Sequence, residues 1–257
     1  MSAGPDLTRR VLLAGAGALA LAAPVIARQP GFPHRVPDGL IYFVGNSFTR
    51  QHAIPALVCS IAAASGTPAH CHPHTANGAW LDASTDFAEA ALAERGEPIP
   101  GTVVLQDHSI APISPHGRLR STQAIRAWSA AFTNTVLFET WPRRDGHPLY
   151  SQRQTPGSPE EMAEIVNDHY LLLARETGAV PAPIGLAWLE AETEGIDLFA
   201  QDGYHANLAG GWLAAMMLAR ALDLPSPYQA PPPDGIDPAT STALARIAAL
   251  HAYDPTL

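Results

Sequence analysis

Short apolar runs closed by turn residues recur along the chain, and segments with helical features separate them. Such runs are typical of buried strands in a parallel sheet. The first, residues 40–44, leads directly into Gly45 and Asn46. Strands are predicted over residues 40–44, 68–73, 102–106, 135–140 and 180–184.

The segments between these runs carry helical periodicity or helix-start signals. Residues Ile125, Trp128 and Phe132 recur at three- and four-residue spacing, which gives one apolar helix face. Ser158 precedes Pro159, as at the capped start of a helix. Helices are predicted over residues 51–65, 83–95, 119–132, 159–177, 206–222 and 239–251, with a short helix at Trp188. The alternation predicts an α/β fold, with a five-stranded parallel sheet covered on both faces.

The first 27 residues have the features of an export signal. Arg9 and Arg10 precede a moderate apolar run that ends near Ala23, as in a twin-arginine signal. Residues 25–27 fit a small-x-small cleavage site, so the mature chain is expected to begin near Arg28. A periplasmic or secreted protein follows from this pattern, and an uncleaved anchor is the alternative.

Residues 28–257 are predicted to form one domain, because neither repeats nor an internal domain boundary interrupt them. The Pro-rich stretch at 225–238 is expected to be part of a C-terminal tail wrapped on this domain. The formal net charge of −9 argues against nucleic acid or anionic membranes as partners. The oligomeric state stays open.

The only two cysteines are Cys59 and Cys71, which belong to the first predicted helix and the second predicted strand. They are plausible neighbours and could form a disulfide in an oxidising compartment. Two buried free thiols are an equally good interpretation, because sequence gives no distance between them.

Candidate chemistry begins at Ser47, just beyond the first predicted strand. Ligands of open α/β sheets bind beyond the carboxyl ends of the strands, so Ser47 lies where a nucleophile would be useful. Gly45 is expected to let the backbone turn sharply. The alternative is that Ser47 only caps the next helix.

A base for Ser47 would come from the stretch that precedes the last long predicted helix. Asp202 and His205 are three residues apart there. A carboxylate beside a histidine ring can fix its tautomer and stabilise the imidazolium, so that the ring acts as a base toward serine. An Asp–His turn that caps the helix is the alternative.

Together, Gly45-Asn46-Ser47-Phe48-Thr49 and Asp202-Gly203-Tyr204-His205 resemble the motifs of the SGNH superfamily of GDSL-type serine esterases. Residues 103–109 and 139–142 resemble a subgroup known mainly as an uncharacterised domain. The resemblance implies a flavodoxin-like three-layer α/β/α sandwich. It also implies a triad of Ser47 as nucleophile, His205 as base and Asp202 as its partner, with no metal or organic cofactor.

The same resemblance assigns an oxyanion hole to the Ser47 N–H, Gly78 and a polar side chain after the third strand. The superfamily has Asn in that third place, whereas this chain offers His108 or Gln106, either of which can donate a hydrogen bond. His108 is preferred by position. A second departure is Asn46, which stands where the motif usually has Asp.

Other residues are candidates for contact with substrate. Asn77 and Asn46 flank the expected oxyanion donors, and Trp141 follows the fourth strand, where it could stack on a sugar or pack in the core. Arg143 and Arg144 could meet an acidic substrate or lie solvated on a loop.

Three histidines, His70, His72 and His74, alternate along the second predicted strand. They could hold zinc on one strand face, although Pro73 interrupts an even strand. A polar strand end is the interpretation we favour, and no metal site is predicted.

These patterns predict an exported serine hydrolase that cleaves small acyl esters, foremost acetyl esters, on carbohydrates or similar polar molecules. Acyl transfer to a polysaccharide is one alternative, because the same triad can deliver its acyl group to a sugar hydroxyl. A catalytically silent carbohydrate-binding module is another, and the altered motif after the third strand is its best support.

Overall fold

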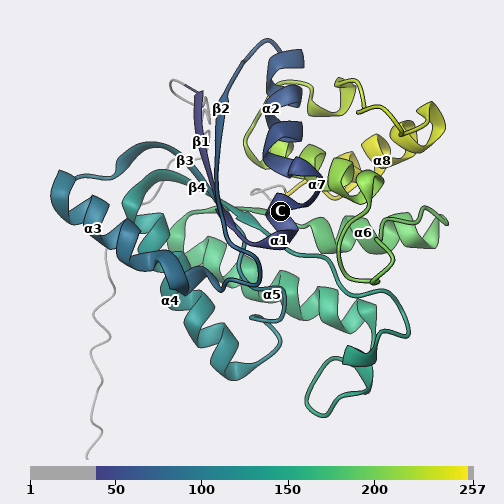
Figure 1. Ribbon diagram of the computed structural model, residues 1–257, viewed down its shortest axis with the longest axis horizontal. Helices are drawn as coiled ribbons and strands as arrows, with labels where there is room; N and C mark the ends of the chain where they lie inside the picture. Colours follow the sequence, from purple (N-terminus) through teal and green to yellow (C-terminus); the bar gives the residue numbers. More distant parts are fainter. Residues whose placement is uncertain (1–38, 254–257) are drawn as a thin grey trace, which may run out of the picture. The chain divides into compact units, whose positions relative to one another are not determined.

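The structure is a computed structural model that describes residues 39–253. Its five strands form one parallel sheet in the order β2-β1-β3-β4-β5, the flavodoxin-like order. The strands are β1 (Leu40–Gly45), β2 (His70–Thr75), β3 (Ile99–Leu105), β4 (Phe132–Phe138) and β5 (Val180–Ala182) (Figure 1). The predicted five-stranded parallel sheet is therefore confirmed.

Strand boundaries differ from the predicted ones by a few residues. Both β3 and β4 begin three residues earlier than expected, at Ile99 and Phe132, whereas β2 runs from His70 to Thr75. Pro73 lies inside β2 because this strand is at the edge of the sheet, where a missing backbone donor is tolerated.

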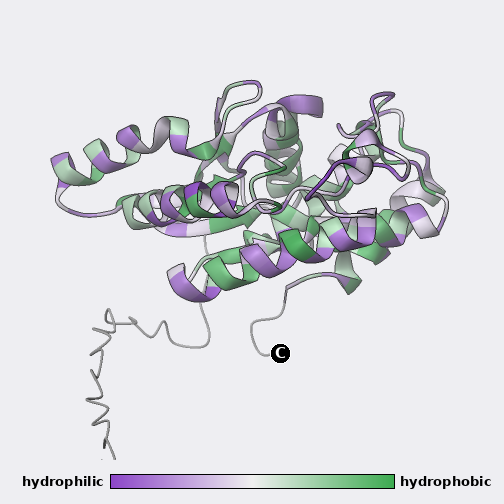
Figure 2. Cartoon of the chain, turned by 90° about the horizontal axis from the view of Figure 1, so that it is seen from below, coloured by the Kyte–Doolittle hydropathy of each residue, from purple (hydrophilic) through white to green (hydrophobic). Residues whose placement is uncertain are grey.

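Helices cover both faces of the sheet, which gives three layers (Figure 1). One face packs against α2 (Ile54–Ala64), α6 (Ile184–Thr193), α7 (Leu208–Ala221) and α8 (Pro238–Leu250). The other packs against α3 (Thr85–Arg95), α4 (Pro115–Ala131) and α5 (Pro159–Thr177). The helices carry hydrophobic and hydrophilic residues in alternating patches (Figure 2), as expected for elements with one buried face.

The alternation of side chains along β1 divides the core in two. Ile41 and Phe43 belong to the cluster beneath α2 and α7, whereas Val44 belongs to the cluster beneath α4 and α5. Because both faces of β1 are buried, its carboxyl end is held firmly where Ser47 begins the next element.

The helix predicted over 51–65 is interrupted. A four-residue helix α1 (Ser47–Arg50) and a 3₁₀ turn η2 (Gln51–Ala53) precede α2. His52 and Ala53 have left-handed backbone angles at this kink, with φ of 52° and 50°. The His52 Nε2 lies 3.1 Å from the carbonyl oxygen of Ala206, which holds the kink against the residue after His205.

Cys59 of α2 and Cys71 of β2 form a disulfide, with their Cα atoms 6.1 Å apart. The bond ties a covering helix to the edge strand of the sheet. Of the two interpretations that the sequence left open, the structure therefore has the disulfide.

The Pro-rich stretch after α7 contains one 3₁₀ turn, η5 (Pro227–Gln229), and leads into α8. Leu244 and Ile247 of α8 are fully buried. The C-terminal tail therefore contributes to the hydrophobic cluster that also contains α2 and α7. Within residues 39–253, no helix is long and apolar enough to cross a membrane. The predicted export signal at 1–27 lies outside the described residues.

Candidate active site

Ser47, His205 and Asp202 form a chain of hydrogen bonds. Ser47 follows β1, and the other two residues lie in the loop between α6 and α7. The His205 Nε2 is 2.9 Å from the Ser47 Oγ, and the His205 Nδ1 is 2.8 Å from the Asp202 Oδ2. In this arrangement the imidazole can take the serine proton while the carboxylate holds the opposite ring nitrogen.

Asp202 is itself held in place by the loop that carries it. Its Oδ1 accepts hydrogen bonds from the backbone N–H groups of Tyr204, at 3.1 Å, and His205, at 2.9 Å. Desolvation acts to raise the pKa of Asp202, but hydrogen bonds from the His205 ring and these two N–H groups lower it overall. The carboxylate therefore stays ionised and fixes the Nδ1–H tautomer of His205.

The backbone around Ser47 is shaped by its two preceding residues. Asn46 caps α1, since its side-chain oxygen accepts from the Phe48 N–H at 3.1 Å, so the interpretation of Ser47 as the cap is wrong. Gly45 is required because neighbouring side chains pack directly against its Cα, and not because the backbone turns unusually there. A Cβ at this position would lie 2.4 Å from the Thr49 hydroxyl and 2.7 Å from Gln106 Oε1.

Gln106 ties the loop after β3 to the nucleophile. Its side-chain oxygen accepts from the Asn46 backbone N–H and from the Thr49 hydroxyl, both at 2.9 Å, and its amide nitrogen donates to the Asp107 carbonyl. Only 1% of Gln106 is exposed. The alternative that Gln106 serves the oxyanion is therefore wrong, because its amide nitrogen donates to the backbone.

Asp107 ties the loop after β3 to the loop after β2, as Gln106 ties it to the loop after β1. One carboxylate oxygen accepts from the Leu81 N–H at 2.8 Å and from the His108 N–H at 2.6 Å. Burial is the main cause that raises the pKa of Asp107. Gln106 and Asp107, here called the hub dipeptide, therefore hold together the loops that follow β1, β2 and β3.

Gly78 and His108 line the same hollow as Ser47 and His205. Gly78 has φ of +66°, a conformation that favours glycine. Ser47, as the first residue of a helix, has a backbone N–H that the helix does not use. Three candidate donors thus border the position where a substrate carbonyl would meet Ser47.

His108 is oriented by its neighbours. Its ring stacks on Trp80 with centroids 4.8 Å apart, and its Nδ1 accepts a long hydrogen bond, 3.4 Å, from the Ile110 N–H. Arg120 lies 4.2 Å from the Trp80 ring and pairs with Asp82. This stack fixes the plane of the imidazole beside the hollow.

The protonation state of His108 suits a neutral donor. Burial and the positive charges of Arg143 and Arg120 lower its pKa. With Nδ1 acting as an acceptor, the proton of the neutral ring is on Nε2, so that this N–H can donate.

The remaining candidates differ in what they can touch. Asn77 is exposed and lines the hollow. Asn46 also borders it but is 2% exposed, and its amide nitrogen donates to the Ala79 carbonyl at 2.9 Å, so it serves mainly to position the loops.

Trp141 does not reach the hollow. It is fully buried, stacks on Trp188 at 4.2 Å and donates from its indole nitrogen to the Tyr204 carbonyl at 2.9 Å. Of the two interpretations that the sequence left open, the structure therefore has the core packing, and Trp141 supports the loop that carries His205 instead of contacting substrate.

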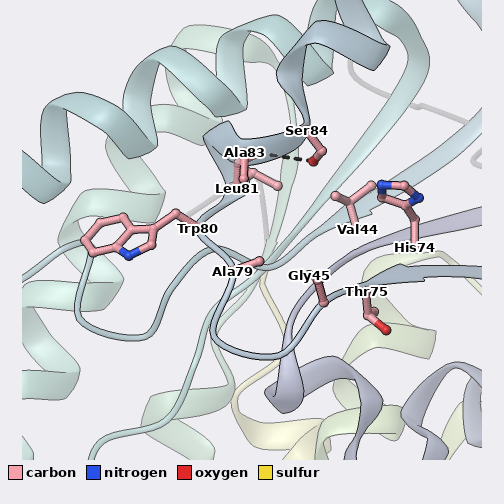
Figure 3. Close-up of a pocket in the computed structure, with 10 residues that line it drawn as sticks. Val44, Gly45, His74, Thr75, Ala79, Trp80, Leu81, Ala83 and Ser84 are labelled. Atoms are coloured by element: carbon pink, nitrogen blue, oxygen red, sulfur yellow. Dashed lines mark hydrogen bonds between the residues drawn. The ribbon is translucent and has the colours of Figure 1, made fainter.

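A second hollow borders the same loop after β2, since Ala76 and Ala79 line it. Its lining includes Val44, His74, Leu81 and Ser84 (Figure 3). The Trp80 indole points away from His74 in Figure 3. The same indole stacks on His108. None of Ser47, Asp202 and His205 lines this second hollow.

The alternating histidines of β2 are mostly exposed, and His74 stacks near Tyr42 with ring centroids 6.0 Å apart. Among residues 39–253, no group of three or more His, Cys, Asp or Glu side chains is arranged to hold a metal ion. The strand places His70, His72 and His74 in a row along an edge instead of around a centre.

Neither a protein-family model nor a curated protein matches the sequence. Solved structures do match. A protein assigned as an SGNH hydrolase from Slackia heliotrinireducens is 23% identical over 72% of this chain and 100% of its own, with a TM-score of 0.60. A DUF4886 family protein from Bacteroides uniformis is 19% identical over 81% of this chain and 92% of its own, with a TM-score of 0.64.

The chain has the SGNH/GDSL hydrolase fold. A variant of the acetyl xylan esterase Axe2 from Geobacillus stearothermophilus shares the SGNH fold, at 10% identity over 72% of this chain and 94% of its own and a TM-score of 0.52. At these identities the likeness concerns the SGNH fold, and the chemistry of this chain has to be argued from its own residues.

Proposed function

We propose that the protein is an exported serine hydrolase that cleaves small acyl esters. The observation that carries the proposal is the hydrogen-bonded chain from Asp202 through His205 to Ser47, at a hollow bordered by Gly78 and His108. A hollow of about 440 Å³ is within the usual range for small-molecule sites.

In the first half of the reaction, the Ser47 Oγ attacks the ester carbonyl carbon while the His205 Nε2 takes the hydroxyl proton. The carbonyl oxygen becomes an oxyanion that accepts hydrogen bonds from the Ser47 and Gly78 N–H groups and from His108. The bond to the alcohol oxygen then breaks, and the alcohol leaves with the proton that His205 returns.

In the second half, water attacks the acyl group on Ser47 and gives a proton to His205. The bond to Ser47 breaks, the acid leaves, and the serine hydroxyl regains its proton from His205. Asp202 stays ionised throughout and stabilises the imidazolium.

Within this reaction class, acetyl esters of carbohydrates are the substrates we place first. The SGNH fold is shared with an acetyl xylan esterase. The hollow at Ser47 is bordered by polar groups such as Asn77, Ser109 and Arg143, which suit a polar substrate better than a long acyl chain.

The test is hydrolysis of 4-nitrophenyl acetate by the wild-type chain and by Ser47→Ala. The variant should lose about 10⁴- to 10⁶-fold in kcat, as expected when a triad nucleophile is removed. Ser60→Ala is the matched control, because Ser60 is exposed on α2 and donates only to the Leu57 carbonyl among the described residues. Equal rates in wild type and Ser47→Ala would refute the serine mechanism. If a sugar acceptor is added to the assay, formation of an acylated sugar would reveal acyl transfer instead of hydrolysis.

A further inference from the structure

Arg143 is a buried cation at the edge of the candidate active site. It follows β4, is only 7% exposed and lines the hollow that contains Ser47 and His205. Its backbone is fixed by Tyr150, whose hydroxyl donates to the Arg143 carbonyl at 2.7 Å. The interpretation of this residue as part of a solvated loop is therefore wrong.

The groups in contact with the Arg143 guanidinium are neutral, and the Asp202 carboxylate acts on it only from beyond ion-pair distance. The Arg143 Nη2 donates to the Ser109 hydroxyl at 2.7 Å, and the Nη1 is enclosed without a hydrogen-bond acceptor among the described residues. The charge lies over the rings of Tyr204, at 4.8 Å, and Phe48, at 5.3 Å. No carboxylate in the described part of the chain comes within ion-pair distance of it.

Arg144, the next residue, shows how an arginine is ordinarily accommodated. Arg144 is exposed and pairs with Asp197 at 2.7 Å. A cation withdrawn from water without an anionic partner is unfavourable, and contacts with aromatic rings offset only part of that cost. Burial lowers the pKa of Arg143 to about 10, so the side chain is still charged at neutral pH.

We propose that Arg143 is the site of an anion in the substrate, and that the protein prefers esters that carry a carboxylate near the scissile carbonyl. This inference rests on the proposed function and names its substrate class. A carboxylate in the hollow can accept charge-assisted hydrogen bonds from a guanidinium and supply the anion in direct contact that Asp202 does not provide. Acidic sugar esters and half-esters of dicarboxylic acids both have this chemistry.

The test compares matched ester pairs that differ in one negative charge. One pair is 3-acetoxybenzoate and its methyl ester, which places the carboxylate on the alcohol side. The other is 4-nitrophenyl hydrogen adipate and 4-nitrophenyl methyl adipate, which places it on the acyl side. For each pair, the ratio of kcat/KM for the anionic ester to that for the neutral ester is measured.

Wild type should prefer the anionic member of at least one pair, and Arg143→Gln should lower that ratio about 10- to 100-fold. Arg143→Lys, which keeps the charge but not the planar fork, should retain part of the preference. Arg144→Gln is the matched control for net charge and should leave the ratio unchanged. An equal loss on both members of each pair would overturn the proposal, because Arg143 would then act on the oxyanion or on folding. A wild type without preference would overturn it as well.

A binding measurement tests the anion site independently of the proposed hydrolase activity. Ser47→Ala should bind one of the two anionic esters in calorimetry, and Ser47→Ala/Arg143→Gln should bind it at least 10-fold more weakly. If 4-nitrophenyl acetate is not cleaved but this difference is found, the proposed hydrolase activity fails while the anion site stands. Equal binding by the two proteins would overturn the anion site.

Discussion

The altered position after β3 offers the sharpest test of how the site stabilises charge. In His108→Ala, the oxyanion loses the donor that the Trp80 stack orients toward the hollow. Loss of one such donor costs about 10²- to 10³-fold in kcat, or about 2.7–4 kcal/mol of transition-state stabilisation. His108→Asn returns a neutral N–H donor and should recover part of the loss.

Gln106→Ala is the informative comparison. It removes the acceptor of the Asn46 N–H and of the Thr49 hydroxyl, in residues that are 2% and 0% exposed. Each buried donor left without a partner costs about 1–3 kcal/mol, so the free energy of unfolding should fall by about 2–6 kcal/mol. His108→Ala, at a half-buried position, should change that free energy much less.

The assay combines 4-nitrophenyl acetate turnover with urea unfolding of the same preparations. We expect His108→Ala to lose kcat at near wild-type stability and Gln106→Ala to lose mainly stability. The reasoning would be refuted by a His108→Ala enzyme within threefold of wild type in kcat, or by a folded Gln106→Ala that is stable yet inactive.

Three further predictions concern the support of the site and of the fold. Asp202→Asn should lose about 10⁴-fold in kcat, because an amide no longer selects the Nδ1–H tautomer of His205; a loss below tenfold would contradict the assigned role. Cys59→Ser/Cys71→Ser should lower the free energy of unfolding, measured in urea, by about 3 kcal/mol, because the disulfide no longer closes a loop between residues 12 apart in sequence. If a reductant left the stability of the wild-type protein unchanged, this prediction would be contradicted. His169 is buried in α5, and burial, followed by the charge of Arg118, lowers its pKa to about 4 in the folded chain. Since the unfolded value is about 6.5, stability should fall as the pH drops from about 6.5 to about 4, by up to about 1.4 kcal/mol per pH unit. His169→Gln should remove that dependence, and an identical pH slope in the variant would count against it.

The fold was largely predictable because its strands are short apolar runs separated by helical segments. That pattern places Ser47 after β1 and His108 after β3, and parallel strands bring their carboxyl ends to one edge of the sheet. Asp202 and His205 are far from Ser47 in sequence, and it was the resemblance that joined the two stretches.

The errors arise where side-chain direction decides the outcome. Trp141 and Arg143 are two residues apart after β4, yet Trp141 packs on Trp188 while Arg143 lines the hollow. Gln106 and His108 are also two apart, and only contacts with Asn46 and Thr49 from another element show that Gln106 faces inward. The hydrophobicity and spacing of residues along the sequence do not predict such contacts between distant segments.

The hub dipeptide has a consequence for how such a site can diverge. Gln106 and Asp107 bind the loops after β1 and β2, which carry the nucleophile and Gly78. The loop after β4 is held differently, by Tyr150 on the Arg143 carbonyl and by the Arg144 N–H on the Gly203 carbonyl at 2.8 Å. The loop after β4 also donates from Trp141 and Arg144 to the loop that carries His205. Exchange of the loop after β4, like substitution of Gln106 or Asp107, would therefore disturb every substrate alike. New substrates with the same reaction machinery would instead come from single side chains that line the hollow, such as Asn77 and Arg143.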